Sequence, residues 1–165
     1  MNSTARRCRI PSEGEESAMS ELGERLYRQI IEQSGIAIVY GDVEGVIRLW
    51  NKGAEEIFGW TAEEALGKSM DFIIPEKHRR AHAEGYRRVM TSGVTKYGRS
   101  MLAVPALTKG GQRISVEFSI VLLKEDGGTI AGAAAFISDV TQRWERDKAL
   151  RKRLEAAEAK AGPMS

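Results

Sequence analysis

The chain has 165 residues, of which 42% are hydrophobic and 29% are charged, and its formal net charge is +2. These values are typical of one globular domain with extensions. They exclude a mainly disordered chain, and no apolar run is long enough to cross a membrane. The small net charge gives no reason to expect direct nucleic-acid binding. The single cysteine, Cys8, cannot form an internal disulfide, so we expect a cytoplasmic protein.

The first fifty residues predict a tail, a helix and a hairpin. Residues 1–19 lack an apolar period, which is typical of a flexible tail. In residues 20–33 apolar side chains recur at helical spacing and predict an N-terminal flanking helix. Two short runs of apolar and β-branched residues, 36–40 and 46–50, are separated by a glycine-bearing loop, and this pattern predicts a β-hairpin.

The middle of the chain predicts short helices followed by one longer helix. Asn51 can cap a helix over residues 52–58, and residues 61–64 have the capping-box pattern that starts a second short helix. A longer helix is expected over residues 75–92, because it begins with proline and ends at Gly93. These helices need an apolar surface to pack against, which the remaining strands would supply.

The last third of the chain changes to a period of two. Residues 96–107, 113–122 and 129–137 predict three strands joined by glycine-bearing turns. We therefore predict an α+β domain over residues 34–140. Its five-stranded antiparallel sheet would carry the short helices and the longer helix on one face, between N-terminal and C-terminal flanking helices. Residues 141–165 would form the C-terminal helix and a tail.

Three stretches of the chain resemble the PAS domain family. They are residues 38–78 (IVYGDVEGVIRLWNKGAEEIFGWTAEEALGKSMDFIIPEKH), 108–123 (TKGGQRISVEFSIVLL) and 132–143 (GAAAFISDVTQR). The resemblance covers roughly residues 26–143 and implies a non-enzymatic sensory domain for signal transduction, with a pocket between the sheet and the long helix. It also implies that Asp139 or Thr141 ties the last strand to the N-terminal part of the domain. The helix that follows would carry the signal to a downstream protein, and regulation of transcription is one expected role.

The long helix resembles that of haem-based gas-sensing PAS domains, which has the pattern Pro-x6-His-x10-Gly. Pro75, His82 and Gly93 stand at this spacing, and Arg88 stands where those members carry an arginine that contacts a haem propionate. A neutral imidazole suits haem iron, and a guanidinium suits a carboxylate. The resemblance therefore implies haem b as cofactor, with His82 as its metal ligand.

The strand after the helix departs from the haem-sensor pattern. Such sensors place a polar or sulfur group over the distal side of the haem, whereas this chain has Leu102 there, with Arg99 and Met101 nearby. An apolar distal face is better suited to CO or NO than to bound O2, and Met101 could become a ligand only through a β-bulge. The apolar walls of the haem pocket would be Tyr97, Val116, Phe118 and Ile120.

Other functions are compatible with the same residues. His82 can be a half-buried histidine in a haem-free PAS module that serves dimerisation, protein interaction or binding of a small organic ligand. We expect His78 at the surface, and no third ligand completes a zinc site with the two histidines. A flavin photoadduct lacks its reactive cysteine, and no catalytic motif is present. The flanking helices predict a homodimer that binds neither nucleic acid nor membrane.

Overall fold

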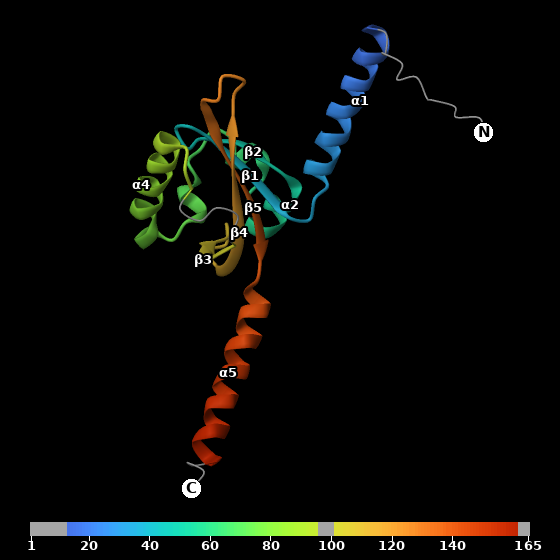
Figure 1. Ribbon diagram of the computed structural model, residues 1–165. Coiled ribbons are helices and arrows are strands. Elements are labelled where there is room, and N and C mark those ends of the chain that lie inside the picture. The colour runs from blue at the N-terminus through green and yellow to red at the C-terminus, as the bar shows by residue number, and fades with distance from the viewer. Residues whose placement is uncertain (1–12, 96–100, 162–165) are drawn as a thin grey trace, which may run out of the picture.

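The computed structural model describes residues 13–95 and 101–161, and the side chains of residues 20–95 and 101–157 (Figure 1). Five antiparallel strands form one sheet in the order β2-β1-β5-β4-β3. The strands are β1 (Ala37–Asp42), β2 (Ile47–Trp50), β3 (Leu102–Leu107), β4 (Arg113–Lys124) and β5 (Ile130–Asp139). The helices are α1 (Glu13–Glu32), α2 (Lys52–Phe58), α3 (Ala62–Ala65), the 3-10 helix η1 (Met70–Ile73), α4 (Glu76–Ser92) and α5 (Thr141–Ala161). The predicted α+β fold is confirmed.

The sheet is built from the hairpin β1–β2 and the three-stranded meander β3–β4–β5, which join where β1 pairs with β5. β1 pairs with β2 on one side and with β5 on the other, and β5 continues through β4 to the edge strand β3. Side chains alternate between the two faces of a strand, so residues that are partners across strands share a face. Val39, Ala135 and Ile120 are partners across β1, β5 and β4 and therefore lie on the same face.

The apolar core lies between this inner face and the short helices. Trp50, Ala54, Phe58, Ile73 and Val116 belong to one buried cluster. The cluster joins β2, α2 and η1 to β4, which explains why a domain of this size can order such short helices. α4 is different, because none of its residues is fully buried. It lies alongside the sheet as a separate wall (Figure 1).

Asn51 is a buried polar residue at the centre of the N-terminal half. Its side-chain oxygen accepts hydrogen bonds from the backbone N–H groups of Ile38 and Ala54, at 2.8 and 3.0 Å. Its amide nitrogen donates to the carbonyls of Ile31 and Ile36, at 2.8 and 3.0 Å. The expected helix cap is confirmed, and the same side chain also ties the end of α1 to β1 and α2.

Some boundaries differ from those expected from sequence. α1 begins at Glu13 rather than at residue 20, so residues 13–19 are helical and not part of the tail. This segment has no apolar stripe, but glutamate, alanine and methionine are good helix formers, and acidic residues favour a helix N-terminus. β3 begins at Leu102, and residues 96–100 of the expected strand lie outside the described residues.

The expected tie between the end of β5 and the N-terminal part of the domain is wrong. The Thr141 hydroxyl accepts a hydrogen bond from the backbone N–H of Ser115 in β4 at 2.9 Å and donates to the Asp139 carboxylate. The guanidinium of Arg143 pairs with Glu117, also in β4. β4 remains beside β5 as far as Asp139, whereas β1 pairs with β5 only as far as residue 137. The start of α5 is therefore fastened to β4.

α1 and α5 extend away from the domain on opposite sides (Figure 1). Both carry apolar side chains that the domain leaves exposed: Leu22, Leu26, Tyr27 and Ile30 on α1, and Trp144, Leu150 and Leu154 on α5. Within the part of the chain that the structure describes, no helix has the length and apolar character needed to cross a membrane.

Candidate functional site

The face that α4 turns toward the sheet is set by helical spacing. His82, Tyr86, Val89 and Met90 are half-buried, whereas His78 is exposed. The helix ends at Gly93, whose φ of 66° places it in the left-handed region, and its N–H donates to the carbonyl of Val89. The expected difference between the two histidines is thus confirmed: His82 turns inward and His78 lies at the surface.

Tyr86 connects α4 to the sheet. Its hydroxyl lies 2.9 Å from the carbonyl oxygen of Gly41 and 2.6 Å from that of Asp42, and it shares its one hydrogen between them. Burial, reinforced by the charge of Asp42, raises the pKa of Tyr86 to about 12. Gly41 permits this approach, because a Cβ atom there would lie 3.0 Å from the Tyr86 oxygen. The tie joins the middle of α4 to the end of β1.

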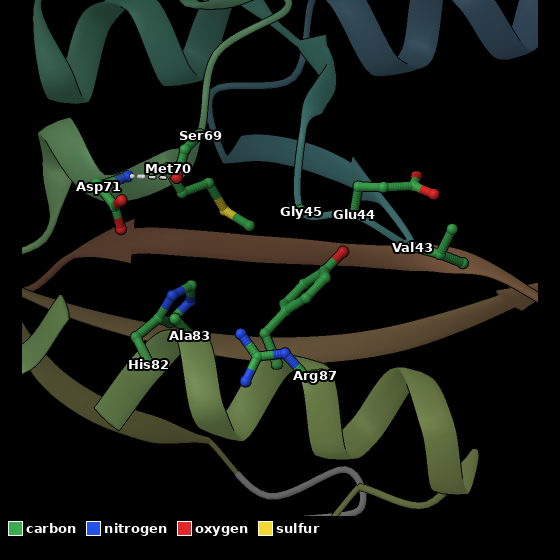
Figure 2. Close-up of a pocket in the computed structure, with 10 residues that line it drawn as sticks. Val43, Glu44, Gly45, Ser69, Met70, Asp71, His82, Ala83 and Arg87 are labelled. Atoms are coloured by element: carbon green, nitrogen blue, oxygen red, sulfur yellow. Dashed lines mark hydrogen bonds between the residues drawn. The ribbon is translucent and has the colours of Figure 1, made fainter. Parts of the chain in front are cut away.

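Three segments line an open pocket of about 190 Å3 beside this tie (Figure 2). The β1–β2 turn forms one wall, the start of η1 forms the second and α4 forms the third. The lining residues are Val43, Glu44, Gly45, Ser69, Met70, Asp71, His82, Ala83, Tyr86 and Arg87. An isolated antiparallel bridge between Val46 and Ser69 holds the first two walls together. Both polar and apolar groups therefore face one small cavity.

His82 is the half-buried titratable group of this pocket. Burial lowers the pKa of its imidazole, and the nearby Asp71 carboxylate opposes that shift. The imidazole is therefore neutral at pH 7. Its ring centroid lies 6.1 Å from that of Tyr86. Within residues 13–95 and 101–161 the imidazole makes no hydrogen bond. A neutral, partly desolvated imidazole without a hydrogen-bond partner is available to a ligand.

Arg87, rather than the expected Arg88, lines the pocket. Arg88 is exposed on α4 and lies outside the pocket. Figure 2 shows the Asp71 carboxylate on the η1 side of the pocket and the Arg87 guanidinium on the α4 side, with the Glu44 carboxylate turned away. Among the described residues, neither Asp71 nor Arg87 forms an ion pair through its side chain. In the part of the chain that the structure describes, three charged side chains without an ion pair therefore line the pocket, namely Asp71, Glu44 and Arg87, and Glu44 turns its carboxylate away.

The sheet residues that were expected to surround haem do not line this pocket. Leu102 is half-buried and pairs with Phe118 across β3 and β4, and Ile120 lies two residues further along β4. Val116 is only 3% exposed and belongs to the core, while Met101 is 55% exposed. Tyr97 and Arg99 lie outside the described residues. The pocket therefore brings His82 together with the β1–β2 turn and η1, and the expected residues of β3 and β4 are not among its lining residues.

The chemistry of the site favours haem b in one respect and counts against it in two others. The imidazole of His82 has suitable donor chemistry for haem iron. However, pockets that hold even drug-sized ligands usually measure about 300–1,000 Å3, and this one measures about 190 Å3. Arg88, the expected propionate partner, is also absent from its lining. A smaller molecule matches the available space.

Sequence reasoning missed Met70, Asp71 and Arg87. Arg87 follows the inward Tyr86 along α4, so helical spacing could have found it. Met70 and Asp71 carry no such signal, because a contact across the Val46–Ser69 bridge brings them to the site. Such a pairing between distant segments leaves no local pattern in the sequence.

A family model and several known proteins match this chain. A family model described as PAS fold matches residues 31–145. The chain is 29% identical over 140 residues to an uncharacterised protein of Azorhizobium caulinodans, and the match covers 84% of this chain and 18% of that protein. It is 32% identical over 65 residues to the sensor protein FixL of Bradyrhizobium diazoefficiens, covering 39% of this chain and 13% of FixL. The chain thus spans less than a fifth of these curated relatives.

A solved structure supports the same fold. The PAS domain of a Colwellia psychrerythraea protein superposes on this chain with a TM-score of 0.63 at 21% identity. The match covers 72% of this chain and 98% of that domain. At this level of identity the likeness concerns the fold alone.

Proposed function

Because this chain belongs to the PAS fold family, we propose that it is a sensory and signal-transduction domain whose signal is a small organic molecule bound beside His82. One observation carries the proposal: a neutral, half-buried imidazole without a hydrogen-bond partner faces a pocket between α4, η1 and the β1–β2 turn. A buried polar group of this kind gains a partner when a ligand enters. The proposed role is non-catalytic.

The proposed output route runs through β4 to α5. Val116 and Phe118 face the core, while the alternating residues Ser115 and Glu117 face the other way and hold the first turn of α5. A shift of β4 would therefore change the position of α5 directly. A ligand would drive such a shift only if it binds the two positions with different affinity.

We also propose that the domain works as a homodimer through its flanking helices. Leu26 and Ile30 are 48% and 66% exposed on α1, and Trp144, Leu150 and Leu154 are at least 50% exposed on α5. Exposed apolar side chains on helices that extend from a domain are typical of a protein-interaction surface. Sedimentation of the wild type and of a Leu26→Glu, Leu154→Glu variant tests this: we expect a dimer that becomes a monomer. A dimer unchanged by both substitutions would contradict it.

A screen of small organic compounds tests the sensory proposal. We expect at least one compound to raise the melting temperature of the wild type, because a ligand that binds only the folded state stabilises it. The same compound should have less effect on His82→Gln, which keeps a polar side chain but changes its shape. His78→Gln is the matched control, because His78 is exposed on the same helix. Equal stabilisation of all three proteins would place the binding elsewhere.

Haem b held by His82 is the second candidate. The neutral imidazole of His82 favours haem, as does the spacing of Pro75, His82 and Gly93. The pocket volume counts against haem. When bound, haem would supply an iron centre for a diatomic gas. If this candidate is correct, haem-reconstituted protein will have a Soret band that shifts with CO and is lost in His82→Ala. An unchanged band in that variant would remove His82 as the ligand.

A further inference from the structure

Two charged side chains line the pocket from opposite walls. Arg48 pairs with the Asp42 carboxylate and Arg80 with the Glu84 carboxylate, whereas Arg88 has no carboxylate partner among the described residues. Arg87 has none among the described residues, and Asp71 has no cation. Both side chains line the same cavity, one from α4 and one from η1 (Figure 2). A ligand with complementary charges would pair with both.

The chemistry of each group indicates which part of a ligand it would hold. A guanidinium is planar and makes two parallel hydrogen bonds to a carboxylate. A carboxylate such as that of Asp71 accepts from an ammonium or a hydroxyl. His82 lies near Asp71 and is neutral, so it can exchange a hydrogen bond with either group without repelling a positive charge. The three side chains together suit a carboxylate next to an amino or hydroxyl group.

The size and inner lining of the pocket limit the rest of the molecule. The pocket measures about 190 Å3, which is below the roughly 300–1,000 Å3 typical of pockets for drug-sized ligands. Met70, Ala83 and the ring of Tyr86 supply apolar surface within it. This leaves room for a short carbon chain beside the polar groups, and not for an aromatic cofactor.

We propose that the pocket binds a small 2-amino or 2-hydroxy carboxylic acid, with its carboxylate on Arg87 and its amino or hydroxyl group on Asp71 and His82. The inference rests on the proposed function, because it names the ligand class of the same pocket. The proposed ligand differs from haem b in size and charge, and its carboxylate would pair with Arg87 rather than with Arg88.

Titration of 15N-labelled protein with matched probes tests the proposal. L-alanine and L-lactate carry the carboxylate, whereas L-alaninamide and L-lactamide have the same shape without its charge. We expect the two acids to shift the backbone amide signals of residues 43–45, 69–71 and 82–87. We expect Arg87→Gln to weaken their binding at least tenfold, because a charged hydrogen-bond pair is lost. Arg88→Gln, on the same helix but outside the pocket, should leave binding unchanged.

The outcomes separate this inference from the proposed function. One outcome is that the amides bind as tightly as the acids, and that this binding is lost in His82→Gln but kept in Arg87→Gln. That outcome would support the pocket as the binding site and overturn the proposal that its ligand is a carboxylic acid. If none of the four probes shifts any amide signal, the proposal of a small 2-amino or 2-hydroxy acid would also be overturned. A Soret band that depends on His82 would overturn both proposals in favour of haem. Circular dichroism of each variant confirms that the fold is kept, as expected for the exposed Arg87 and Arg88.

Discussion

Replacing Asn51 by alanine should be among the most damaging single changes to this domain. The side chain is fully buried, and it makes hydrogen bonds of 2.8–3.0 Å with four backbone groups and a longer one of 3.4 Å with Ser34. A buried backbone group that loses its partner costs about 1–3 kcal/mol, and water entering the space recovers part of this. We expect the free energy of unfolding to fall by about 3–5 kcal/mol in total.

Urea denaturation of the wild type, Asn51→Ala and Thr61→Ala measures this effect. Thr61 is also a helix cap, with a complete capping box, but it is exposed. Loss of such a cap costs about 1 kcal/mol, so the difference between the two variants isolates the buried network. Asn51→Asp keeps the acceptor for Ile38 and Ala54 but loses the donors to the carbonyls of residues 31 and 36. If Asn51→Ala were no worse than Thr61→Ala, the proposed network would be refuted.

Three further predictions concern α4, the glycines and the start of α5. Tyr86→Phe should lower the free energy of unfolding by about 1 kcal/mol at pH 7. The pKa of Tyr86 is raised from 10.0 to about 12, so the contribution of its hydroxyl to the free energy of unfolding is complete below pH 10 and is lost as the pH rises through 12. In urea titrations the free energies of unfolding of the wild type and the variant should therefore converge over that range. Gly53→Ala should destabilise the domain by at least about 2 kcal/mol, because the new Cβ would lie 2.5 Å from the carbonyl oxygen of Ile36. Gly85 lies in open space on α4, so Gly85→Ala should stabilise the domain by about 0.5–1 kcal/mol. Equal effects of the two substitutions in thermal melts would contradict the close packing at Gly53. Arg143→Gln should leave stability nearly unchanged, because its pair with Glu117 lies at the surface, but it should increase the mobility of a spin label on α5. Exchanging the charges of Glu117 and Arg143 should restore the wild-type spectrum.

Local features of the fold and the direction of the site histidine could be predicted from the sequence. The cap at Asn51, the capping box at Thr61 and the helix end at Gly93 are all present as expected. The inward direction of His82 and the outward direction of His78 also follow from 3.6 residues per turn. Such features involve groups a few residues apart, so the chain order alone brings them together.

The start of α1 shows where local patterns fail. Residues 13–19 carry no apolar stripe, and the absence of a helical period predicts a tail, whereas these residues are helical. Helix propensity alone predicts the helix only weakly, because it adds a few tenths of a kcal/mol per residue. The tie of Thr141 to Ser115 was missed for a different reason, since it depends on which strand lies beside the end of β5.

Alternation, caps and helical spacing are local properties, so the amino-acid order was enough to predict the α+β class, the order of the elements and the direction of His82, while the PAS family followed from the resemblance of three stretches. What faces His82 depends on long-range packing. The Val46–Ser69 bridge brings Asp71 to the pocket, and the tie from Tyr86 to Gly41 fixes α4 against the end of β1. β3 and β4 instead pack Leu102 against Phe118 away from the pocket. These pairings join residues far apart in the chain, and their geometry is set by the register of the whole sheet.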